Sequence, residues 1–149
     1  MYSDFDLLGG FVVKLVPPTQ GRPLREALRR LGFTTYALDL AGVRDKSDLF
    51  GRLHGALGLG ELVPGVPTGW DGMSDCLWQR VTLDGLTNAA LVLRATNAAL
   101  ARNLDMIFQL AEVWIQLEQA VCEARREAGE PPFRARLFIE HAAADEPAE

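Results

Sequence analysis

The chain has 149 residues, of which 48% are hydrophobic, so it can bury the core of one domain without disulfides or metals. Its 15 basic and 20 acidic side chains give a formal net charge of −5 at pH 7. This charge argues against general binding to nucleic acid or anionic membrane, because both need a basic patch. A basic protein partner is favoured instead.

Cysteine usage and the N-terminus point to one compartment. Cys76 and Cys122 are too few for a disulfide framework. Residues 1–4 lack the basic start of a signal peptide, and no apolar run approaches the roughly 20 residues of a membrane span. We therefore expect a cytoplasmic protein with reduced thiols and no membrane contact.

The first third of the chain alternates strand and helix patterns. Residues 11–16 form a short apolar strand that ends at Pro17 and Pro18, and residues 23–31 have leucines at helical spacing before Gly32. Residues 34–40 have a strand pattern. A helix opens at 45–48, and its inner stripe comprises Leu49, Phe50, Leu53 and Leu57. Residues 59–69 hold two prolines and three glycines, which predicts a loop.

A short acidic helix follows this loop. At roughly 100° per residue, Asp71 and Asp75 project from one face, and Trp78 falls beside them. The opposite face carries Trp70, Met73, Leu77 and Val81. Two acids and a large aromatic on one exposed face indicate a docking surface.

Each of these residues also has a purely structural interpretation. Thr68 fits the N-cap of a capping box, and Asp71 lies where a carboxylate stabilises the helix dipole. Asp75 can be simply solvated, and Trp78 can seal the helix against the loop. Trp70 and Trp114 are expected in the core.

The second half completes an α/β pattern. Residues 89–93 lack polar alternation, which suits a strand covered on both faces. Asn97 can cap a helical stretch over 98–129 that breaks near Asn103, and residues 134–140 form the last strand. The helical stretch carries apolar residues at Leu104, Ile107, Phe108, Ala111, Trp114, Ile115 and Val121. The fold class is therefore α/β, with three parallel strands at 34–40, 89–94 and 134–140 and helices packed against them. The small acidic tail 141–149 is expected to be disordered.

The sequence gives little support to catalysis or metal binding. His54 and His141 are far apart and away from any Ser or Cys motif, and His54 is expected on the surface. The cysteines provide no metal-ligand spacing, and Gly58-Leu59-Gly60 is too little to cradle a phosphate. We expect no enzyme activity, no cofactor and no metal.

Two segments together resemble the barstar family of intracellular ribonuclease inhibitors. They read YALDLAGVRDK at 36–46 and, after a helix and a loop, WDGMSDCL at 70–77. The resemblance covers roughly 34–140, so it implies a small, three-layer-like barstar fold over these residues, with 1–33 as a strand and helix extension of the same domain. The specific part is the aromatic-Asp-small-apolar-x-Asp-Cys-Leu pattern of the second segment.

The resemblance implies that the acidic helix and the loop before it block the active site of a secreted ribonuclease, as an immunity protein does in bacteria. Asp71 and Asp75 match the family's inhibitory acids, and Glu123 takes the place of a further acidic contact. Thr68, Gly69, Trp70 and Trp78 flank this surface. The family's aromatic and Gly-x-Asn before the helix are replaced here by Val66-Pro67-Thr68-Gly69, so the loop contacts must differ.

Two functions remain open from sequence. One is a monomeric inhibitor whose acids occupy phosphate positions of a basic ribonuclease, through charge-assisted hydrogen bonds. The alternative is a non-catalytic interaction module of the same fold with a partner that is not a nuclease. A ribonuclease encoded beside this chain would favour the first.

Overall fold

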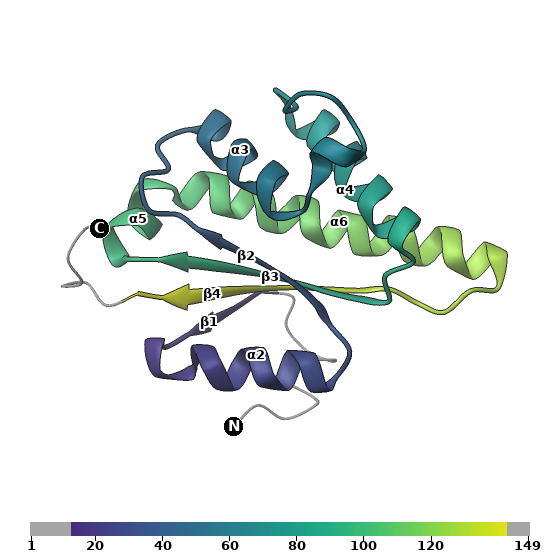
Figure 1. Cartoon of the computed structure of the whole chain (residues 1–149), viewed down its shortest axis with the longest axis horizontal. Helices are drawn as coiled ribbons and strands as arrows, with labels where there is room; N and C mark the ends of the chain where they lie inside the picture. Colours follow the sequence, from purple (N-terminus) through teal and green to yellow (C-terminus); the bar gives the residue numbers. More distant parts are fainter. Residues whose placement is uncertain (1–12, 143–149) are drawn as a thin grey trace.

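The computed structural model describes residues 13–142, and these residues form an α/β layer structure (Figure 1). Four parallel strands make one sheet, and five α-helices and two short 3-10 helices connect them. In chain order the elements are β1 (Val13–Val16), η1 (Pro18–Gln20), α2 (Gly21–Arg30), β2 (Thr34–Asp39), α3 (Lys46–Ala56), η2 (Leu59–Glu61), α4 (Trp70–Asp84), β3 (Asn88–Ala95), α5 (Asn97–Arg102), α6 (Leu104–Ala128) and β4 (Arg134–His141).

The α/β class and the parallel pairing are confirmed, but the strand count is corrected. The strand order is β1-β4-β3-β2, so the N-terminal strand joins the sheet as a fourth member instead of remaining outside it. Val13 pairs with Leu137 and Val16 with Glu140. On the side away from β3, the backbone N–H and C=O groups of β4 would lack strand partners, and β1 supplies these partners. Positions 11 and 12 of the predicted strand lie outside the described residues.

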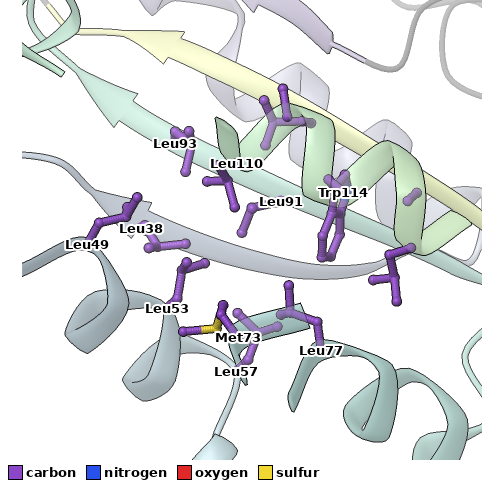
Figure 2. Packing of buried hydrophobic residues seen from close by; sticks show 14 of the residues in the cluster. Leu38, Leu49, Leu53, Leu57, Met73, Leu77, Leu91, Leu93, Leu110 and Trp114 are labelled. Carbon is purple, nitrogen blue, oxygen red and sulfur yellow. The ribbon is translucent and has the colours of Figure 1, made fainter. Parts of the chain in front are cut away.

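Helices cover both faces of the sheet, as Figure 1 shows, with α3, α4 and α6 on one side and α2 on the other. The larger core lies on the first side, where leucines of the strands meet Met73, Leu110 and the fully buried Trp114 (Figure 2). On the other side, α2 packs Leu24 and Leu28 against β1, β3 and β4. The central strand β3 is therefore covered on both faces, as its continuous apolar run predicts.

Several element ends differ from the sequence-based expectation. Thr96, not Asn97, is the N-cap of α5, because its hydroxyl accepts the Ala99 N–H at 3.2 Å. The predicted loop after α3 contains one 3-10 turn. The break near Asn103 is confirmed, and its buried amide donates to Val43 O at 3.2 Å and Ala99 O at 3.0 Å.

The exposure of individual residues adds detail to the sequence-based expectations. Leu104 and Phe108 are 45% and 63% exposed, because they lie on the flank of α6 that turns away from the sheet centre. His54 is only half-exposed, and its Nε2 atom is enclosed, so it is less accessible than the expected surface position. The last strand continues through His141, and Ala142 N donates to Ala95 O at 2.8 Å, so His141 belongs to the sheet and not to the expected tail. Residues 143–149 lie outside the described residues.

A buried carboxylate fixes α2 to the sheet. Glu140 of β4 accepts a hydrogen bond from Arg25 at 2.7 Å, and its side chain is only 11% exposed. A Cβ atom on Gly21 would lie 2.3 Å from Glu140 Oε1, so a larger residue there would have to displace the Glu140 carboxylate. Because α2 has no acidic residue in its first turn and no side-chain cap, Glu140 is the anion at its positive end.

Candidate functional site

The acidic helix α4 begins one residue later than the capping-box prediction requires. Gly69 is the N-cap residue, with φ −131° and ψ 163°, and no side chain bonds to the first turn. Thr68 is exposed, so its predicted role as N-cap is wrong. Glycine is itself an acceptable N-cap, which explains why no hydroxyl is needed. Asp71 remains in the first turn, where it interacts favourably with the helix dipole.

Trp70 anchors the start of α4 to two other helices. Its ring meets Phe50 of α3 edge to face, with 4.8 Å between centroids. Its Nε1 atom donates to Gln109 Oε1 of α6 at 2.9 Å. Trp70 is therefore half-buried at a three-helix junction and does not lie fully in the core, whereas Trp114 does. This packing holds the first turn of α4, and so Asp71, in a fixed position.

The loop before α4 is tied down at both ends. Arg80 of α4 donates to Gly58 O at 2.7 Å and to Asp84 at 3.2 Å, and it pairs with Glu61 at 3.4 Å. Burial alone lowers the pKa of this guanidinium, but the hydrogen bonds and charges of Asp84 and Glu61 outweigh it, so the net shift is upward. Arg80 stays charged and clamps the loop.

The other end of the loop packs directly on the helix. A Cβ on Gly72 would lie 3.3 Å from Pro67 Cβ, so the loop approaches α4 closely at this point. The Val66-Pro67-Thr68-Gly69 sequence therefore packs on α4 through Pro67, at the position where the barstar family has an aromatic residue and Gly-x-Asn.

Asp71 and Asp75 are both exposed on the outer face of α4. Neither carboxylate has a hydrogen bond or an ion pair within residues 13–142. They stand one helical turn apart, on a helix fixed by Trp70 and Arg80, so their spacing is rigid. Both carboxylates are solvated and have no side-chain partner, so they are available for an external cation.

A groove between α4 and α6 adjoins Asp75. It has a volume of about 230 Å³ and is lined by Ser74, Asp75, Trp78, Val113, Gln116, Leu117 and Ala120. Trp78 is half-buried and packs on the core, and it forms a wall of this groove. The three- and four-residue spacing of the α6 members is the signal that could have revealed them in the sequence.

Glu123 is exposed on α6 but lies outside this groove. Helical spacing puts it one turn beyond Ala120, on the same side of α6. The structure therefore brings Asp75 and Trp78 together with α6, and it leaves Glu123 at the periphery. Together, Asp71, Asp75, Trp78 and the groove are called the α4 surface below.

The Cys76 thiol beside Asp75 is not an activated group. Burial, and next the charge of Asp75, raises the pKa of the Cys76 thiol, so this thiol is neutral at pH 7 and not an activated nucleophile. Residues 13–142 contain no group of three or more His, Cys, Asp or Glu side chains that could hold a metal ion. Over the same residues, no helix is long and apolar enough to cross a membrane.

Comparisons with known proteins add no relative. No protein-family model matches the chain, and no curated protein matches it.

Proposed function

We propose that this chain is a barstar-like inhibitor, with the small barstar fold over residues 34–140, that binds a basic ribonuclease through the α4 surface. The observation that carries the proposal is the pair of exposed, unpartnered carboxylates Asp71 and Asp75 on one face of a rigid helix. The resemblance of residues 70–77 to the family's acidic helix supports the same function.

The chemistry follows from what a ribonuclease active site must bind. Such a site holds phosphate with cationic side chains, and carboxylates present oxygen acceptors to the same donors. Because α4 is fixed by Trp70 and Arg80, its acids lose little conformational freedom on binding, which favours affinity. The net charge of −5 speeds encounter with a basic enzyme. The chain itself needs no catalytic group for this function.

The direct test measures inhibition of purified ribonucleases. The panel comprises basic microbial ribonucleases and any small secreted ribonuclease encoded beside this chain, with RNA cleavage as the readout. The parent protein should inhibit at least one of them in a one-to-one ratio. Asp71→Asn and Asp75→Asn should each weaken inhibition by about 10- to 100-fold, the equivalent of a lost charge-assisted hydrogen bond of about 1.5–3 kcal/mol.

A matched control separates recognition from bulk charge. Glu130→Gln removes one exposed negative charge near the C-terminal end of α6, away from the α4 surface. It should inhibit as the parent does. If the parent inhibits no ribonuclease but captures a partner without nuclease activity through Asp75, the chain is an interaction module of this fold. The replaced loop residues 66–69 are the feature that would explain such a change of partner.

A further inference from the structure

The groove between α4 and α6 has the form of a site for one long side chain. Its α6 wall is a ridge of residues at three- and four-residue spacing, Val113, Gln116, Leu117 and Ala120. Its α4 wall comprises Ser74, Asp75 and Trp78. The groove volume of about 230 Å³ lies below the roughly 300–1,000 Å³ of sites for drug-sized ligands. A single side chain therefore fits it better than a nucleotide does.

The lining of the groove combines apolar walls with one negative charge. Leu117 is buried, and Trp78 and Val113 are half-buried, so an aliphatic chain that lies against them loses contact with water. Among the lining residues in the described part of the chain, Asp75 alone is charged, and it is exposed. The complementary ligand therefore has an aliphatic stem and a positively charged head.

Hydrogen-bond acceptors in the same lining favour a guanidinium over an ammonium group. Gln116 Nε2 donates to Glu112 Oε1 at 3.3 Å, so the side-chain carbonyl oxygen of Gln116 is left to accept. The Ser74 hydroxyl is a further acceptor. A guanidinium has five N–H donors in a planar fork, and it packs on aromatic rings such as that of Trp78 more often than an ammonium group does. Arginine is therefore the side chain that matches the groove.

We propose that the groove receives one arginine side chain of the protein partner, with its guanidinium on the Asp75 carboxylate and its aliphatic stem against Trp78 and Leu117. The inference rests on the proposed function for the identity of that partner. It gives the two acids different roles, because Asp71 lies outside the groove lining of the described residues. Asp71 faces the phosphate-binding cations, whereas Asp75 and Trp78 select a partner that has an arginine within reach of the groove.

A small probe tests the groove without any ribonuclease. N-acetyl-arginine methylamide is titrated into the isotope-labelled full chain, and the indole N–H signal of Trp78 is followed by NMR. Trp70 and Trp114 are internal references, because their indole N–H groups donate to Gln109 and to Arg136 O within the fold. The Trp78 signal should shift saturably, with a dissociation constant on the order of millimolar, while the other two stay in place. The neutral citrulline analogue should bind at least about tenfold more weakly.

Substitutions in the groove and beside it locate the bound probe. Ala120→Leu fills the groove from an exposed position of α6, and Asp75→Asn removes its charge. Each should weaken binding of the probe by about tenfold or more. Gln119→Leu is the matched control, because it puts the same side chain on the preceding, exposed residue of α6, outside the groove lining. This control should bind the probe as the parent does, and circular dichroism checks that each variant is folded.

The same variants distinguish failure of this inference from failure of the proposed function. Against a ribonuclease that the parent inhibits, Ala120→Leu should weaken inhibition by about tenfold or more, and Gln119→Leu should not. Full inhibition by Ala120→Leu overturns the arginine site and leaves the inhibitor function standing. A Trp78 signal that ignores the probe, or that responds equally to the citrulline analogue, also overturns the site. A parent that binds the probe but inhibits no ribonuclease overturns the inhibitor function and not the groove.

Discussion

Two pairs of carboxylates in this protein have opposite surroundings. Glu118 and Glu140 are largely buried, and each accepts a hydrogen bond from an arginine, at 2.9 Å from Arg136 and 2.7 Å from Arg25. Asp71 and Asp75 are exposed and have no partner in the described part of the chain. The first pair holds the sheet to its helices, whereas the second contributes little to the fold. An exposed acid without a side-chain partner is free to serve recognition, and this contrast can be tested by substitution.

The largest effect on stability is expected for the buried acid Glu140. Glu140→Ala removes the partner of Arg25 and the anion at the start of α2. Because Arg25 is half-exposed and can turn to solvent, we expect a loss of about 2–3 kcal/mol in the free energy of unfolding, below the cost of breaking a fully buried pair. Urea denaturation measures this value. Glu130→Ala is the matched control, and equal stability of the two variants would contradict the anchoring role.

Gly21→Ala should have the next largest effect. In most helices this change is stabilising, by up to about 1 kcal/mol. Here the new Cβ would lie 2.3 Å from Glu140 Oε1, so we expect a destabilisation of about 1–2 kcal/mol by denaturant unfolding. In the Glu140→Ala background the clash is absent and the sign should reverse. The same sign in both backgrounds would show that the contact does not limit residue 21.

Tyr36 should contribute a smaller, pH-dependent effect. Burial, and next the charge of Asp84, raises its pKa in the folded state above 10.0, while Arg80 lowers it. The unfolded chain therefore loses this proton first as the pH rises, and stability falls from about pH 10 upward. Tyr36→Phe should lose less stability than the parent between pH 9 and 11 in urea melts, with both compared at pH 7 as a reference. If stability falls equally with pH in the two proteins, Tyr36 is not the cause of the fall.

Thr68→Ala should have the smallest effect. Replacement of an N-cap threonine by alanine lowers the free energy of unfolding by about 0.5–2 kcal/mol. Because Gly69 is the N-cap and Thr68 is exposed, we expect a change below about 0.5 kcal/mol in thermal and denaturant unfolding. Thr96→Ala, at the N-cap of α5, is the positive control and should show the full cost. A large loss of stability for Thr68→Ala would show that Thr68 is the N-cap of a capping box.

Local sequence patterns predicted the parallel strands, the long helix with its break at Asn103, and the exposure of Asp71 and Asp75. These features depend on periodicity and turn residues close in the chain, which a single sequence contains. Long-range contacts were not predictable in this way. The fourth strand depends on pairing between Val13 and Leu137, and the groove beside Trp78 depends on how α6 packs against α4. Thr68 and Gly69 both suit an N-cap, so neighbouring packing decides between them.

We propose that Asp75 serves recognition and not stability. The most direct test measures the inhibition constant toward a ribonuclease that the parent inhibits, and the free energy of unfolding, on the same preparations of parent, Asp75→Asn and Glu130→Gln. We expect Asp75→Asn to weaken inhibition by about 10- to 100-fold and to change stability by less than about 0.5 kcal/mol, while Glu130→Gln changes neither. A parent that inhibits no ribonuclease, or an Asp75→Asn variant that inhibits as the parent does, would contradict it.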